Sequence, residues 1–307
     1  MRAALRHGAA EAPVSPAPAP AQEVGRLLPG HSGARVILHS NGRDSFVRKT
    51  AASRAGSARL KAQADKQHAF WMLGLPFPKV RAQAAAGTGS FDMNYIPGRT
   101  IADAVMNGGA FDPGAVVKAV ERLMALFALA AGEDLPARIF EDKIHAVANH
   151  ATATMADPDL RHAVRRCGRL LTARDWRGIP QSPCHGDLTL ENILLTAGRS
   201  IAFIDCDEGF ASSYWLDVGK LFQDLDGHWC IRALYARDAE PVRRLNAIQK
   251  LDQLGIHFRR LAARMDAALP GRLPQLAALG LFRAVPYART DAVRRFLCRR
   301  IAHVLRA

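Results

Sequence analysis

Residues 184–209 decide the fold and read CHGDLTLENILLTAGRSIAFIDCDEG. Three polar side chains interrupt an apolar background: Asp187, Asn192 five positions later, and Asp205 at the end of an apolar run. Residues 193–196 and 200–204 predict a small hairpin between them. A strand leading into Asp205 would hold its carboxylate rigidly, and the short segment after Asp187 would let the three side chains converge.

Phosphoryl transfer uses these residue types. A carboxylate must orient the attacking hydroxyl and accept its proton, while an amide oxygen and a carboxylate oxygen must hold Mg²⁺ against the phosphates. The alternative is that Asp187 belongs to an ordinary turn and Asn192 caps a helix, which leaves Asp205 unexplained. The pattern therefore predicts a magnesium-dependent phosphoryl-transfer centre.

The segment resembles the aminoglycoside phosphotransferase and choline kinase branch of the protein-kinase-like superfamily. That family's loop runs His-Gly-Asp, four residues and Asn, and its metal-binding Asp follows a short hairpin. The resemblance implies that Asp187 is catalytic, that Asn192 and Asp205 bind Mg²⁺, and that His185 supports the loop. It also implies ATP as co-substrate and a small-molecule hydroxyl (a sugar, amino alcohol or aminoglycoside) as acceptor.

The chain before the motif predicts a small β-rich lobe. The expected elements are a hairpin over 35–40 and 45–50 around Asn-Gly, a helix over 58–73, and a strand over 91–96 that ends before Pro97. The resemblance places a nucleotide site on this lobe. Its residues would be a glycine loop (Gly30, Ser32, Gly33), a phosphate-contacting lysine (Lys49) and a hinge whose backbone meets adenine (Asn94, Tyr95, Ile96).

One departure from the family concerns the partner of this lysine. The family usually supplies a Glu from the following helix, but no Glu occurs between residues 50 and 90. Gln67, on the expected apolar face of that helix, is the best substitute by position, with Gln63 as its rival. An amide accepts a hydrogen bond from an ammonium group without the charge that roughly doubles the bond's strength.

The remainder of the chain predicts a larger helical lobe. Amphipathic segments cover 115–131, 140–155 and 160–173, and helical patterns resume from Ser213. Asp217, among apolar neighbours, resembles the buried Asp that supports the catalytic loop from below. Asp207 and Glu208 follow Asp205 closely enough to add to the metal environment, but they are expected to be solvated.

The predicted fold class is therefore α+β, a two-lobed protein-kinase-like fold. Residues 1–22, rich in Ala and Pro, are expected to form a disordered tail. Residues 23–97 would form the small β-rich lobe with the glycine loop and the lysine, and 98–307 the mostly helical lobe with the catalytic loop and basic C-terminal helices.

Composition limits the class of protein further. The longest strongly apolar stretch, 123–131, is far shorter than the roughly 20 residues of a membrane-spanning helix. Five cysteines lie far apart without a CxxC pair, which argues against a disulfide framework or a zinc site and favours the cytoplasm.

The net charge of +14 favours anionic partners. Residues 256–307 hold eleven arginines and two aspartates. They predict either a solvated arginine face on a helix or a surface for an acidic acceptor, and nucleic acid is disfavoured because few aromatics accompany the arginines. Two other functions stay open: a protein kinase or self-phosphorylating kinase, and a non-catalytic kinase-like module that binds a polyanion.

Overall fold

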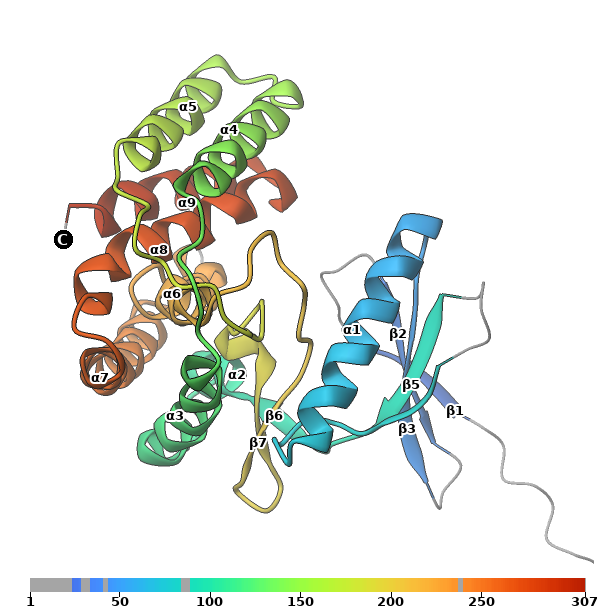
Figure 1. Ribbon diagram of the computed structural model, residues 1–307. Helices are drawn as coiled ribbons and strands as arrows, with labels where there is room; N and C mark the ends of the chain where they lie inside the picture. Colours follow the sequence, from blue (N-terminus) through green and yellow to red (C-terminus); the bar gives the residue numbers. More distant parts are fainter. Residues whose placement is uncertain (1–23, 29–33, 41–43, 84–88, 237–239, 307) are drawn as a thin grey trace, which may run out of the picture.

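The computed structural model describes residues 24–28, 34–40, 44–83, 89–236 and 240–306, and these form two lobes (Figure 1). The predicted Ala/Pro tail lies outside the described residues. The small lobe contains β1 (Val24–Leu27), β2 (Arg35–Ser40), β3 (Ser45–Thr50), α1 (Arg54–Met72), β4 (Val80–Gln83) and β5 (Ser90–Asn94). The five strands form one antiparallel sheet in the order β1-β2-β3-β5-β4.

A compact apolar core joins this sheet to α1. Alternation along β3 buries Val47 and Lys49 on one face, and Leu60 and Ala64 of α1 lie against that face. Helix α1 begins four residues before the predicted position, because the side chain of Ser53 caps it by accepting the Gly56 N–H at 3.2 Å. The predicted hairpin is confirmed.

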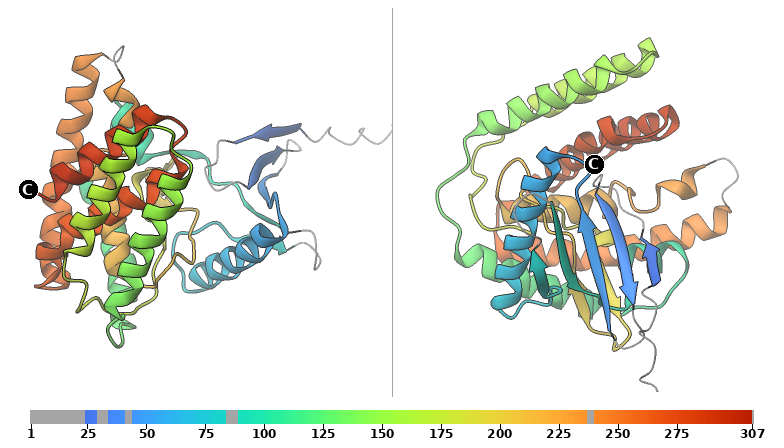
Figure 2. Two further views of the ribbon diagram at one scale, coloured as in Figure 1. Left: turned by 90° about the horizontal axis from the view of Figure 1, so that it is seen from above. Right: turned by 90° about the vertical axis from the view of Figure 1, so that its right-hand side faces the viewer.

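The large lobe is mostly helical. Its elements are β6 (Gly98–Thr100), α2 (Ile101–Met106), α3 (Pro113–Leu129), α4 (Ala137–Ala153), α5 (Pro158–Thr172), β7 (Ile193–Thr196), β8 (Ile201–Phe203), α6 (Tyr214–Leu225), α7 (Pro241–Met265), α8 (Leu269–Ala284) and α9 (Asp291–Val304). Strands β6, β7 and β8 form a second antiparallel sheet. Helices α4 and α5 lie side by side as a projecting pair (Figure 2). The two-lobed α+β organisation is confirmed.

Helix α6 is the central element of the large lobe. It is buried along nearly its whole length and lies against α8, with Gly219 at the closest approach. A Cβ at that position would lie 2.8 Å from the Cβ of Leu276, closer than packed atoms approach. A glycine at position 219 therefore allows α6 and α8 to pack this closely.

The two cores meet through aromatic rings. Phe70 at the end of α1 and Phe77 after it belong to the large-lobe core, where the Phe77 ring lies 5.7 Å from that of Phe203 on β8. The Phe203 N–H also donates to the Pro76 carbonyl at 2.8 Å. The segment after α1 therefore attaches the small lobe to the strand that precedes Asp205.

Five of the eleven C-terminal arginines form ion pairs within the large lobe itself. Ion pairs join Arg259 to Asp226, Arg264 to Glu121, Arg272 to Asp175, Arg294 to Asp291 and Arg295 to Asp157. Such pairs favour the interpretation of this stretch as helices with a solvated basic face. All five cysteines are free and buried. Among the described helices, none combines the length and apolar character needed to cross a bilayer.

Candidate active site

Asp187 and Asn192 meet through a short loop that ends in a single turn of 3-10 helix, Leu190–Asn192. The Asn192 side-chain amide donates to the Asp187 carboxylate at 3.1 Å and to the Asp187 carbonyl at 2.7 Å. Asn192 is buried, whereas 41% of the Asp187 side chain stays accessible. The carboxylate is therefore held in place and still reachable by a second molecule.

One face of α6 supports this loop at three points. Asp217 accepts the N–H groups of His185 and Gly186 at 2.5 and 2.7 Å. Lys220 Nζ lies 3.1 Å from Asp187 Oδ1, and Asp224 accepts the Leu190 N–H at 2.7 Å. The structure thus places Asp217 beneath the loop. Lys220 and Asp224 were missed from the sequence, although their spacing of three and seven positions from Asp217 puts them on the same helix face.

The electrostatics of Asp187 suit a carboxylate that is ionised at neutral pH. Burial is the largest influence and opposes its ionisation, but the neighbouring positive groups, Lys220 first among them, together keep the pKa of Asp187 below its ordinary value. The carboxylate can therefore accept a hydrogen bond from a hydroxyl group.

His185 lies wholly buried behind the loop. Burial lowers the pKa of His185 to about 4, and its Nδ1 accepts the Asp187 N–H at 3.3 Å, as a neutral imidazole can. Its carbonyl accepts the Asp207 N–H at 2.8 Å. Gly186, with φ of 91°, lets the two segments approach, since a Cβ there would lie 1.9 Å from the Asp207 carbonyl oxygen.

Asp205 lies beside Asn192 because the Ile204 N–H donates to the Asn192 carbonyl at 3.0 Å. Its backbone is left-handed, with φ of 60°, an unusual conformation for a residue with a side chain. Its carboxylate forms an ion pair with Lys49 and remains 39% accessible. Lys49 itself is almost completely buried. Its ammonium, which comes from β3 of the small lobe, contacts Asp205 of the large lobe directly.

The expectation that Gln67 partners Lys49 is wrong. Gln63 accepts from the Lys49 ammonium at 3.3 Å and donates to the Cys206 carbonyl at 2.5 Å. Gln67, one turn further along α1, donates instead to the Pro78 carbonyl at 2.8 Å and packs inside the small lobe. Gln63 therefore faces Lys49 and the segment after β8, whereas Gln67 faces the interior of the small lobe.

Asp207 also differs from the expectation that it is solvated, whereas Glu208 is exposed as expected. Arg59 of α1 holds the Asp207 carboxylate with two hydrogen bonds, at 2.9 and 2.7 Å. Lys66 donates to the Asp207 carbonyl at 2.5 Å. One side of α1 therefore contacts the segment that follows β8 at Cys206 and Asp207.

The other predicted nucleotide residues are placed only in part. The glycine loop (Gly30, Ser32, Gly33) lies outside the described residues. Asn94 ends β5, and its N–H donates to the Lys79 carbonyl at 2.9 Å. The Tyr95 N–H donates to the Ser45 carbonyl at 3.4 Å. Ile96 follows these two residues just before β6, at the junction of the lobes.

The oxygen atoms present fit a hard divalent cation. The Asn192 amide nitrogen donates to Asp187, which leaves its Oδ1 as an acceptor, and Asp205 adds an accessible carboxylate from the adjoining segment. One amide oxygen, one carboxylate and several waters are typical of Mg²⁺ bound with nucleotide phosphates. Asn192 and Asp205 are therefore the residues that could hold it.

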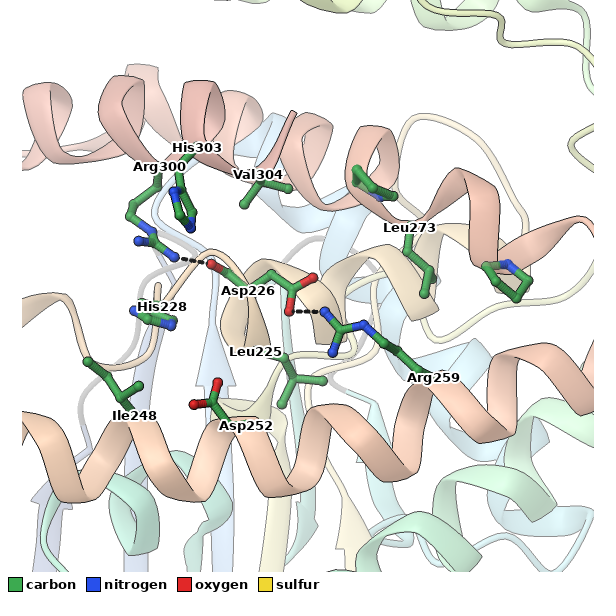
Figure 3. A pocket seen from close by; sticks show the side chains of 12 residues that line it. Leu225, Asp226, His228, Ile248, Asp252, Arg259, Leu273, Arg300, His303 and Val304 are labelled. Atoms are coloured by element: carbon green, nitrogen blue, oxygen red, sulfur yellow. Dashed lines mark hydrogen bonds and ion pairs between the residues drawn. The ribbon is translucent and has the colours of Figure 1, made fainter. Parts of the chain in front are cut away.

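A cavity of about 420 Å³ lies elsewhere in the large lobe, among α6, α7, α8 and α9 (Figure 3). Two arginines in it contact Asp226: Arg259 binds the Asp226 carboxylate at 2.6 Å, and Arg300 donates to the Asp226 carbonyl. None of the residues around Asp187 lines it. This cavity is separate from the site built by the motif.

A small β lobe with a buried lysine, joined to a helical lobe with the Asp187 loop, defines a protein-kinase-like phosphotransferase. Similar solved structures include a thermostable mutant of aminoglycoside phosphotransferase APH(4)-Ia, with 16% identity, a TM-score of 0.61, and 92% of this chain and 94% of that chain covered. Choline kinase from Cryptosporidium parvum shares 10% identity with a TM-score of 0.59, over 92% of this chain and 88% of that one. Ethanolamine kinase from Plasmodium vivax shares 13% with a TM-score of 0.53, over 92% and 82%.

The chain belongs to the phosphotransferase enzyme family, which it matches over residues 23–246. The aminoglycoside phosphotransferase and choline kinase branch expected from the motif is thereby confirmed. Comparison with curated protein sequences gives no significant match. The family match makes the protein a phosphotransferase.

Proposed function

We propose that the protein transfers the γ-phosphoryl group of ATP, with Mg²⁺, to a hydroxyl group of a small molecule in the cytoplasm. The observation that carries the proposal is a series of contacts: Lys49 pairs with Asp205, the adjoining Ile204 N–H donates to Asn192, and Asn192 donates to Asp187. Similar structures were solved with ADP and hygromycin B and with AMP-PNP and hygromycin B, which supports nucleotide use by this fold.

Each residue would have one task. Asp187 orients the acceptor hydroxyl and takes its proton as the acceptor oxygen bonds to the γ-phosphorus and the bond to the bridging oxygen breaks, giving ADP and a phosphate ester. Lys49 contacts the phosphates, and Asn192 and Asp205 hold the cation. When bound, Mg²⁺ neutralises charge on the phosphates. His185, Asp217 and Asp224 keep the loop in position, and catalysis is mostly positioning.

Replacing the Asp187 carboxylate by an amide tests the proposal. The Asp187→Asn variant should lose about two to four orders of magnitude in kcat, because it cannot accept the proton. Its affinity for MgATP should change little, since Lys49 and Asp205 are untouched. An ADP-release assay against sugars, amino alcohols and aminoglycosides measures kcat, and calorimetry measures nucleotide binding.

The matched control is Asp142→Asn, an exposed carboxylate on α4, which should retain both properties. Parent-like turnover by Asp187→Asn would refute the assignment. Stable labelling of the protein by radioactive ATP alone would favour a self-phosphorylating kinase. No rise in melting temperature with MgATP, together with salt-sensitive binding of a polyanion, would favour the non-catalytic module.

A further inference from the structure

Two cations from different helices of the large lobe flank a single aromatic ring near Asp187. Arg283 of α8 lies with its guanidinium carbon 4.8 Å from the centre of the Phe210 ring, and the ammonium of Lys143 on α4 lies 5.8 Å from it. Phe210 follows Asp205 by five residues, in the segment between β8 and α6. We call Lys143 and Arg283 the Phe210 cation pair.

Among the described residues, no carboxylate contacts the Phe210 cation pair directly, although the charges of Asp187 and Asp207 act on Arg283. Within the described part of the chain, neither side chain donates a hydrogen bond or forms an ion pair, unlike the arginines of α7, α8 and α9 that bind carboxylates. Burial lowers the pKa of Lys143, and the charge of Arg283 lowers it further. Burial also lowers the pKa of Arg283. Two like charges, partly withdrawn from water, destabilise the free protein unless an anion joins them.

The pair lies on the catalytic side of the large lobe. After burial, the largest effect on Arg283 comes from the charge of Asp187, which raises the pKa of Arg283. The same interaction helps to lower the pKa of Asp187. The nucleotide residues Lys49 and Gln63 come from the small lobe and meet at Asp205. The cation pair comes from α4 and α8, so it borders Asp187 without taking part in the Lys49–Asp205 contacts.

We propose that the acceptor is an anionic alcohol: a small hydroxyl compound whose carboxylate or phosphate binds Lys143 and Arg283 while its hydroxyl meets Asp187. This inference rests on the proposed function and names its substrate class. A guanidinium group binds carboxylate or phosphate oxygens in pairs, and an ammonium adds a point charge. The Phe210 ring offers an apolar surface for the carbon skeleton. An amine-bearing acceptor would meet two positive charges that form no ion pair in the described part of the chain, and it would be disfavoured.

Compounds matched in skeleton and different in charge test this inference. Glucose, glucosamine, glucuronate and a glucose phosphate form one set, and glycerol, glycerate and glycerol phosphate form another. Each is titrated into the wild-type protein with MgADP by calorimetry and assayed with MgATP for ADP release. A carboxylate or phosphate member should bind at least about tenfold more tightly than its neutral parent. The inference is overturned if no anionic member does so, or if the amine binds best.

Variants of the pair locate the effect. Arg283→Gln and Lys143→Met should each raise the KM or Kd of the preferred anion about tenfold while the KM for ATP changes less than about twofold. Lys143→Arg, which keeps the charge, should retain most of the affinity. Arg260→Gln, an exposed arginine on α7, is the matched control and should behave as wild type. An unchanged anion affinity in Arg283→Gln would overturn the assignment of this site.

The two levels of inference fail differently. If MgADP does not bind the wild-type protein, the proposed function fails. If MgADP binds and an amine-bearing acceptor is phosphorylated at the highest kcat/KM, the kinase proposal stands and the anionic acceptor is wrong. Comparing the affinities of the carboxylate and phosphate members of each set also shows which anion the site prefers. These compounds share a skeleton and differ in the group that would bind Arg283.

Discussion

The side-chain amide of Gln63 is neutral: its oxygen accepts a hydrogen bond from the Lys49 ammonium, and its nitrogen donates one to the Cys206 carbonyl. The Gln63→Ala variant should raise the KM for ATP about two- to tenfold, because it removes one hydrogen bond that orients Lys49. Gln67→Ala is the matched control from one turn away: it should lower the melting temperature and leave the KM for ATP unchanged. Equal effects of both variants on KM would show that Gln63 has no special part in orienting the lysine.

Asp224 should make stability depend on pH. Burial, with the charge of Glu191 adding to it, raises the pKa of Asp224 to about 8, and its Oδ1 is buried without a hydrogen-bond partner. Between the unfolded pKa of 3.8 and about 8 the folded state binds one more proton. The free energy of unfolding should therefore fall as pH rises through this window, by at most about 1.4 kcal/mol per pH unit, and level off above it.

The Asp224→Asn variant checks this sign. It keeps the acceptor for the Leu190 N–H and never ionises, so its stability curve should be flatter and lie above that of the wild type at alkaline pH. Urea titrations across the pH range measure the curves, and exposed Asp142→Asn on α4 should follow the wild type. Parallel curves for Asp224→Asn and wild type would mean that Asp224 is ionised in the folded protein throughout.

At the scale of elements, α6 joins the Asp187 loop to the helical core. Asp217, Lys220 and Asp224 face the loop, and Gly219 faces α8. The Gly219→Ala variant should destabilise the protein by about 1–3 kcal/mol, because the new methyl group would overlap Leu276 and push the helices apart. It should also lower kcat, since the support of Asp187 moves with α6. Thermal melts and turnover measure the two effects.

Gly271→Ala is the matched control for that variant. Gly271 lies in the first turns of α8, and a Cβ there meets nothing within 4 Å. This substitution should leave kcat unchanged and raise stability by up to about 1 kcal/mol through helix propensity. If Gly219→Ala were as stable and active as Gly271→Ala, the close packing of α6 on α8 would have no energetic weight.

The sequence predicts the elements whose patterns are long or whose motif is specific. The Asn-Gly hairpin, the helix with Leu60 and Ala64, and the paired strands before Asp205 were found in that way. Strands β4 and β6 have four and three residues, too few for alternation to be recognised. Gln63 and Gln67 lie one turn apart on one helix face, so only the packing of α1 against the rest of the molecule decides between them.

The site was predictable to the same extent and for the same reason. Asp187, Asn192 and Asp205 are close in sequence to the turns that position them, so spacing suffices to bring them together. The Phe210 cation pair comes from α4 and α8, and its position depends on how the two helices pack. No local pattern distinguishes Arg283 from the ten other arginines of residues 256–307.

At the scale of the whole molecule, the two lobes are coupled through Phe77. Its ring lies 5.1 Å from that of Phe70 on α1 and 5.7 Å from the rings of His185 and Phe203. Arg59, Gln63 and Lys66 add polar contacts from α1 to the segment after β8. Because one buried ring serves the small lobe, the catalytic loop and β8 together, we expect the lobes to unfold in a single cooperative transition.

The Phe77→Ala variant tests this coupling. Removing a buried phenylalanine ring should lower the free energy of unfolding by about 3–5 kcal/mol. Both lobes should then still melt together, in one transition at a lower temperature. Differential scanning calorimetry measures both the midpoint and the number of transitions. Leu129→Ala, at a position that is 86% exposed, is the control and should change little. The expectation fails if the wild type shows two resolved transitions, or if Phe77→Ala shifts only one of two. Either result would mean that the lobes unfold independently. Lys49 would then reach Asp205 without help from this aromatic contact.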